Sequence, residues 1–187
     1  MPRITEERFR ALLSDRRELA AFLGGACLFF ATIEYLVPKP LPFVRLGLAN
    51  LPILLALDLL PAGYILLITA VKVVGQGLLN GTFASYVFLF SMAGSIASTS
   101  VMLLAHRVGG RWITLLGVSV LGALASNGVQ ILLSLLFIFG ANARYIAPLL
   151  LGIGTASGIA IGAFAVVFAR KSRWYQGVRT LHASRSN

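Results

Sequence analysis

The sequence predicts an all-α integral membrane protein with about six transmembrane helices, of which the second is short or discontinuous. Three observations lead to this prediction. Of the 187 residues, 58% are hydrophobic and only 12% are charged, and the mean hydropathy is +0.87. Soluble domains carry about a quarter charged residues. We therefore expect one membrane-embedded domain with almost no soluble part.

Six apolar segments each approach the ~20 residues that a helix needs to cross a bilayer. They are separated by breaks rich in Pro, Gly, Asn or Arg, which are typical of turns. The predicted spans are residues 19–37, 43–60, 62–79, 83–105, 113–139 and 145–169. Residues 19–169 thus form the predicted six-helix membrane domain, between an amphipathic N-terminal segment (1–18) and a basic tail (170–187).

Positive charge is concentrated at the two ends of the chain. Of the 16 Lys and Arg residues, five precede Glu18 and five follow Ala169, while Arg107 and Arg111 flank one loop. By the positive-inside rule we expect both termini on the cytoplasmic side of the cell's inner membrane. The net charge of +10 then indicates topology and contact with the lipid bilayer, and we expect no nucleic-acid partner.

Polar side chains at membrane depth are the first candidates for a substrate site, because ionisable groups there are costly. Lys72 and Gln76 share one face of the third segment, and Asn127 and Gln130 share one face of the fifth. We expect these four side chains to line a polar cavity for a small-molecule substrate. The alternative is interhelical hydrogen bonding that only fixes helix packing.

The second segment contains RLGLANLPILL and is the least regular of the six. Its 18 residues would reach about 27 Å as a helix, which barely spans. Pro52 disfavours helix in the preceding turn and Asn50 is a good N-cap, so the helix should begin between Ala49 and Pro52. Its N-terminus and Arg45 would then face the cavity, with Glu34 as counter-ion. The alternative is a kinked helix whose arginine reaches the head groups.

Small residues at a spacing of four mark places where membrane helices approach closely. The sixth segment has such a seam at Gly154, Gly158 and Gly162. The first segment has a comparable stripe, made of Ala20, Ala21, Gly24 and Gly25. Each stripe packs either within this chain or against another membrane protein.

We expect no catalytic residues, metal site or cofactor in this chain. Chemistry on a diphosphate needs clustered aspartates that hold Mg²⁺, whereas the six acidic residues here are scattered. There is no P-loop, so we do not expect the chain to hydrolyse ATP itself. Asp58 is expected to be a solvated helix end, and His106 and His182 are assigned no role. These residues argue against an autonomous enzyme.

The order of motifs resembles a known family. Glu34 is followed by Pro38, Pro42 and the block RLGLAN (45–50), then by Lys72, by Gly-Thr at 81–82, and by Asn127 with Gln130. This order is similar to that of the heptaprenyl diphosphate synthase component I family, also called the Gx transporter family, over about residues 20–170. Phe43 and Ser126 stand where that family often has Gly and His.

The resemblance implies a fold and two alternative roles. The family looks like the substrate-binding S components of energy-coupling-factor transporters, which are six-helix proteins that take a solute from outside. Such components dock, often through small residues of the first helix, on a transmembrane T component whose ATPase subunits use the ATP. The resemblance therefore assigns the stripe of Ala20, Ala21, Gly24 and Gly25 to partner docking. The family name implies instead a non-catalytic membrane component of a heptaprenyl (polyprenyl) diphosphate synthase system. Neither the residues nor the resemblance identifies the substrate.

The charge asymmetry generates a topology prediction. A reporter fused after Asn187 should be active in the cytoplasm, and one inserted near Asn142 should be active outside, since loops rich in Lys and Arg stay inside. Paired cytoplasmic and external reporter enzymes at both positions would measure this. The opposite pattern would contradict the predicted orientation.

Overall fold

The computed structural model describes residues 15–36, 47–83, 85–110 and 112–183. Within these ranges the chain is helical and contains no β-strand. The elements are α2 (Arg16–Leu36), the 3₁₀ turn η1 (Leu48–Asn50), α3 (Leu51–Ala56), α4 (Ala62–Leu79), α5 (Tyr86–Gly109), α6 (Leu115–Phe137), η2 (Gly140–Asn142), α7 (Ala143–Lys171) and α8 (Arg173–Ala183). The all-α prediction is therefore confirmed.

Five helices among the described residues are long and apolar enough to cross a membrane, namely α2, α4, α5, α6 and α7. The protein is thus a multi-pass membrane protein. In the described part of the second predicted span, residues 47–60, the helical elements are η1 and the six-residue α3, which is about 9 Å of α-helix. The prediction of a short second helix is thus confirmed, while the total of six spans stays a prediction.

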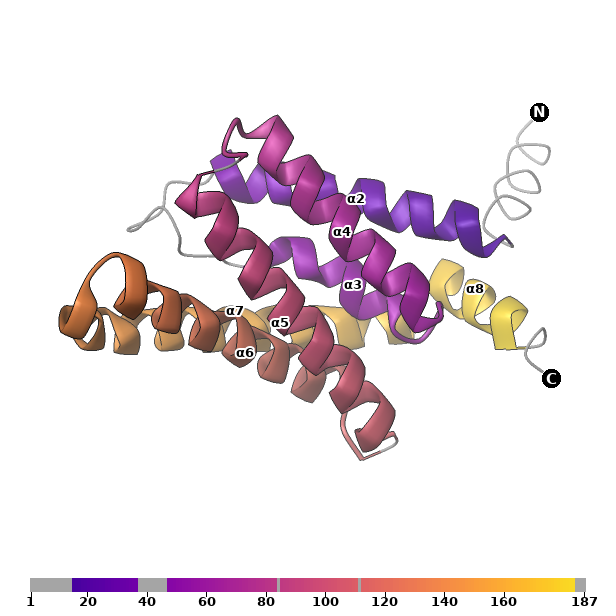
Figure 1. Ribbon diagram of the computed structural model, residues 1–187. Coiled ribbons are helices and arrows are strands. Elements are labelled where there is room, and N and C mark those ends of the chain that lie inside the picture. Colours follow the sequence, from indigo (N-terminus) through magenta and orange to yellow (C-terminus); the bar gives the residue numbers. More distant parts are fainter. Residues whose placement is uncertain (1–14, 37–46, 84, 111, 184–187) are drawn as a thin grey trace.

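Helix α3 lies in the middle of the bundle. Figure 1 shows α2 above it and α6 and α7 below it, with α4 and α5 crossing the view obliquely. All residues from Leu51 to Leu57 are buried, including Ile53 and Leu54 with no exposed surface. A helix that is apolar all round is stable only when other helices enclose it, so α3 is the core of the membrane domain.

Helix α3 begins where the sequence predicted, at Leu51, with Pro52 in its first turn. Gly47 precedes η1 in the left-handed conformation (φ 76°), which glycine adopts without a steric penalty. The capping prediction for Asn50 is wrong, because its side chain makes no capping bond to the helix. That side chain is used elsewhere, as described below.

The glycine seam of α7 packs within this chain, against α6. A Cβ added at Gly162 would lie 2.8 Å from the Leu116 Cα atom, and one at Gly158 would lie 2.8 Å from the Ala123 Cβ atom. No side chain fits at these positions without moving the α6 backbone or its side chains. The Ser119 hydroxyl strengthens the same contact by donating to the Gly158 carbonyl over 2.8 Å.

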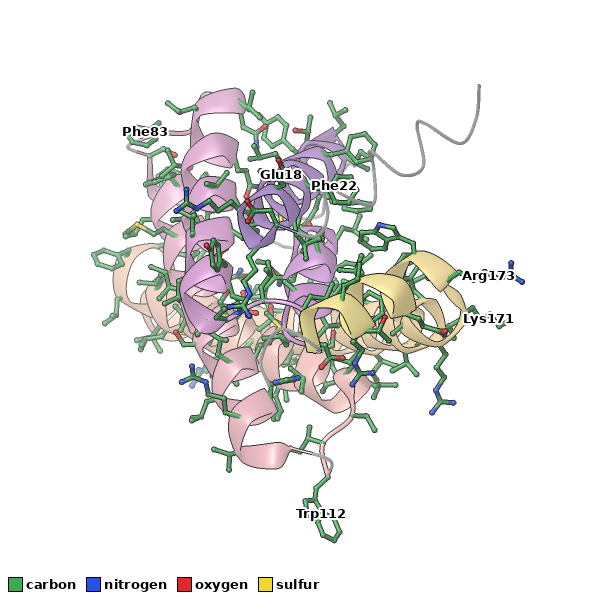
Figure 2. The ribbon with its side chains drawn as sticks, turned by 90° about the vertical axis from the view of Figure 1, so that its right-hand side faces the viewer. Glu18, Phe22, Phe83, Trp112, Lys171 and Arg173 are labelled. Carbon is green, nitrogen blue, oxygen red and sulfur yellow. The ribbon has the colours of Figure 1, made fainter. Side chains whose placement is uncertain are left out.

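The predicted basic tail contains an additional helix, α8. It follows α7 after Ser172 and lies at the same end of the bundle as the start of α2 (Figure 1). Figure 2 shows Lys171 and Arg173 pointing away from the bundle at this end. We refer to this end of the bundle as the α8 end. The predicted amphipathic helix within residues 1–18 falls largely outside the described residues.

Candidate functional site: a buried polar cavity

A polar cavity of about 40 Å³ lies between α2, η1, α3, α4, α5, α6 and α7. Five of the seven predicted substrate-binding residues line it: Glu34, Asn50, Lys72, Gln76 and Asn127. Serines that were not predicted as site residues also contribute, namely Ser95, Ser119 and Ser126. An ammonium, a carboxylate and three amides thus converge inside an otherwise apolar bundle.

Lys72 is the central charged group. It belongs to the predicted polar face of α4, and only 3% of its surface is exposed. Its Nζ donates to Asn50 Oδ1 at 2.5 Å. This bond explains why Asn50 does not cap α3: its amide oxygen accepts from the lysine instead. A buried ammonium is stable only where oxygen atoms replace its lost water, and Asn50 supplies one of them.

Glu34 stabilises the irregular backbone that enters the cavity. This side chain is 5% exposed, and its Oε1 accepts a hydrogen bond from the Gly47 amide at 3.2 Å. In lipid, a backbone amide outside a helix must find a protein partner. The carboxylate therefore ties the end of α2 to the start of η1. Arg45, a predicted ion-pair partner of Glu34, falls outside the described residues.

Asn127 enters the cavity because α7 carries a glycine opposite it. A Cβ added at Gly154 would overlap the Asn127 amide group, and both residues line the cavity. Asn127 is buried, with 4% of its surface exposed. Gly154 is therefore a site residue as well as a packing residue, which the spacing of the glycines alone did not indicate.

Gln130 does not line the cavity, although it is fully buried. Its Nε2 donates to the Ser126 hydroxyl at 3.4 Å, and Ser126 does line the cavity. The Oε1 atom of Gln130 and the nearby Ser134 hydroxyl have no hydrogen-bond partner among the described residues. The sequence predicted Gln130 in the cavity lining, whereas the structure places it behind Ser126.

The predicted docking stripe of α2 is divided between two faces. Ala20 and Gly24 are buried in the bundle, where an added Cβ at Gly24 would lie 3.8 Å from Val71 on α4. Ala21 and Gly25 are exposed, and Gly25 has open space around it. Only the second pair is therefore available for contact with another protein or with lipid.

A second polar cluster joins three elements at the α8 end. Asp58 Oδ1 lies 2.8 Å from His106 Nε2, and Asp58 Oδ2 accepts from the Tyr175 hydroxyl at 3.2 Å. The Asp58 side chain is 17% exposed, so it is a bonded group rather than the solvated helix end that was expected. His106, which the sequence left without a role, lies in the last turn of α5.

No group of three His, Cys, Asp or Glu side chains suited to a metal ion occurs among the described residues. A bundle of apolar helices around a buried cavity with ionisable and amide groups defines a membrane protein with an internal polar site. The chain belongs to the heptaprenyl diphosphate synthase component I family, whose model matches residues 23–168. This confirms the resemblance seen in the sequence. No curated protein and no solved structure matches the chain.

The fit between Gly154 and Asn127 can be tested by a mutant cycle. Gly154→Ala should lower the unfolding temperature in detergent, because overpacking a core costs about 1–3 kcal/mol. Adding Asn127→Ala should recover part of this loss, since the amide that the new methyl group meets is then gone. Gly152→Ala is the control, because Gly152 has open space around it. An equal loss at both glycines, or no recovery in the double variant, would contradict the assignment.

Proposed function

We propose that this chain is the membrane-embedded substrate-binding subunit of an energy-coupling-factor-type importer. It would take a small, anionic or polar-headed solute from the outer side and dock on a transmembrane T component that works with ATPase subunits. Both termini would then lie in the cytoplasm. The proposal needs no catalytic residue, metal or cofactor in this chain, and ATP would be used by the partner subunits.

The polar cavity is the observation that supports this proposal most. Ionisable groups inside membrane domains are expensive and typically mark substrate or ion sites. Here Lys72 and the amides of Asn50, Gln76 and Asn127 converge on one volume, and they offer hydrogen bonds to a carboxylate, a phosphate or another polar group. Purely structural hydrogen bonds between helices would not require a buried ammonium.

The size of the cavity adds a condition to the proposal. A volume of about 40 Å³ is enough for only a few water molecules, so a solute has to widen it. The short segment formed by η1 and α3 is the natural element to move, because its backbone is already interrupted. Arg45, just before Gly47 in the chain, would bring a second positive charge to the widened cavity.

An alternative function follows from the name of the family. In that case the chain would be a non-catalytic membrane component of a polyprenyl diphosphate synthase system. The two functions predict different partners: a T component with ATPases for the importer, and a soluble prenyl synthase for the alternative. Affinity purification from native membranes followed by mass spectrometry of both proteins and small molecules distinguishes them.

Lys72→Met tests the binding role of the cavity. If Lys72 holds the solute, the variant should fold and should retain less of the small molecule that copurifies with the wild type. The expected loss is about 1–3 kcal/mol, typical of a hydrogen bond to a charged group. Lys171→Met, at the exposed end of α7, is the matched control. If Lys72 only balances Glu34, the variant should unfold instead, because it leaves a buried carboxylate unpaired.

Gly25→Trp tests the docking role of α2. Gly25 is exposed and has open space around it, so the indole should be tolerated by the fold but should block close approach of a partner helix. Pull-down of the T component should be lost while solute retention stays normal. Gly128→Trp is the control, since Gly128 is equally open and lies on α6. Normal pull-down by Gly25→Trp would show that this face contacts only lipid.

A further inference from the structure

Tyr175 is the most deeply buried side chain of α8, and it caps a helix that lies far away in the sequence. It has no exposed surface, and its hydroxyl donates to the Leu55 carbonyl at 3.1 Å as well as to Asp58. The phenol has one hydrogen, so these two acceptors share it. Burial, and then the nearby negative charge of Asp58, raise the pKa of the Tyr175 phenol. The hydroxyl therefore keeps its proton and remains a donor.

The Leu55 carbonyl needs this partner because α3 ends early. The Leu59 amide, which would reach Leu55 in a continued α-helix, bonds to the Ala56 carbonyl at 3.0 Å instead. The last carbonyls of a helix have no intrahelical donors, and this end of α3 is buried. A tyrosine 120 residues away in the sequence thus satisfies a backbone group that solvent cannot reach.

The rest of α8 is packed to hold this contact. Val178 is buried, with 4% of its surface exposed. The Trp174 ring lies between Phe22 of α2 and Phe168 of α7, with centroid distances of 5.9 and 6.5 Å. Phe22 is labelled on the side of α2 nearest α8 in Figure 2. Asp58 in addition lies 4.0 Å from Arg179. Helix α8 is therefore attached to α2, to α7 and to the end of α3.

The other end of α3 reaches the polar cavity. Asn50, directly before Leu51, accepts the hydrogen bond from Lys72. Leu55 is five positions after Asn50 in the sequence, which is about 7.5 Å along a helix. One short, enclosed element therefore connects the cavity to α8. A packed element of this kind moves as a unit rather than bending continuously.

We propose that Tyr175 is a positioning residue for the polar cavity, and that α8 is a latch that fixes α3 and thereby sets how Asn50 meets Lys72. The coupling is reciprocal, as any coupling free energy between two sites must be. Removing the Tyr175 contact loosens the packing around the cavity, and substituting a cavity residue such as Asn50 loosens the packing of α8. This inference does not rest on the importer function, and its test needs no solute.

The single cysteine of the chain reports how closely α2 packs against α3. Cys27 is the only cysteine, is fully buried on α2 and lies against the backbone of Ile53 in α3. Tyr175→Phe keeps the ring but removes the hydroxyl. We expect it to raise the rate at which N-ethylmaleimide labels Cys27 about fivefold, the factor for losing one hydrogen bond. Tyr145→Phe, at an exposed tyrosine of α7, should leave the rate unchanged.

Tryptophan fluorescence reports the packing of α8 in a second experiment. In a Trp112→Phe background Trp174 is the only tryptophan, and its fluorescence reports how α8 is packed. Asn50→Ala, at the cavity, should shift the Trp174 emission to longer wavelength. Asn80→Ala is the control, at an asparagine outside the cavity lining. A tyrosine that only packs α8 against its neighbours would not make Trp174 respond to Asn50.

Equal rates of Cys27 labelling in Tyr175→Phe and Tyr145→Phe would overturn the proposal that α8 fixes α3. So would a Trp174 emission that does not respond to Asn50→Ala. Should Tyr175→Phe fail to fold, Asp58→Asn serves as the second variant, because it keeps an acceptor for the tyrosine but weakens it. That variant should give a smaller rise in Cys27 labelling, and no rise at all would also overturn the proposal.

Discussion

The enclosure of α3 is the constraint on which the rest of the structure depends. A helix of six residues cannot reach both faces of a bilayer, so at least one of its ends lies inside the protein. Neither lipid nor water satisfies backbone groups there. Neighbouring helices must therefore supply polar side chains to such an end, and here they do so at both ends of the segment formed by η1 and α3. Glu34 does so for the Gly47 amide at one end, and Tyr175 does so for the Leu55 carbonyl at the other.

This requirement explains some of the polar groups in the cavity, but the cavity contains more of them than the backbone needs. The backbone at the start of η1 needs an acceptor, which Glu34 provides. An ammonium cannot accept a hydrogen bond from that amide, and Lys72 donates one to the Asn50 side chain. This bond displaces the local capping role that Asn50 would otherwise have. The excess of polar groups over this backbone requirement is the physical basis for the proposal that the cavity binds a solute.

Sequence reasoning was most successful where the information is local. The bounds of α4 were predicted to the residue (62–79), and α3 begins at Leu51, within the predicted range from Ala49 to Pro52, because hydropathy and proline geometry act over a few residues. The polar faces of α4 and α6 correctly indicated Lys72, Gln76 and Asn127 as cavity residues. Gln130 was misplaced because helical periodicity gives a face but not the depth of the neighbouring helix.

The contacts that were missed depend on tertiary structure. Tyr175 meets Leu55 across 120 residues, and the charge of the tail, read as topology, concealed an amphipathic helix with Trp174 and Val178 on its inner side. The spacing of Trp174, Tyr175 and Val178 contained that signal.

The glycines of α7 show why packing and binding cannot be assigned to separate residues in this bundle. Gly158 and Gly162 bring α7 onto the backbone of α6, and Gly154 continues the same stripe by one turn. At that turn the space opened by the missing side chain is filled by the Asn127 amide instead of by the α6 backbone. The stripe that holds two helices together therefore also determines where a polar group enters the cavity. Small residues drive helix association in membranes, and here the same property determines the chemistry of the site.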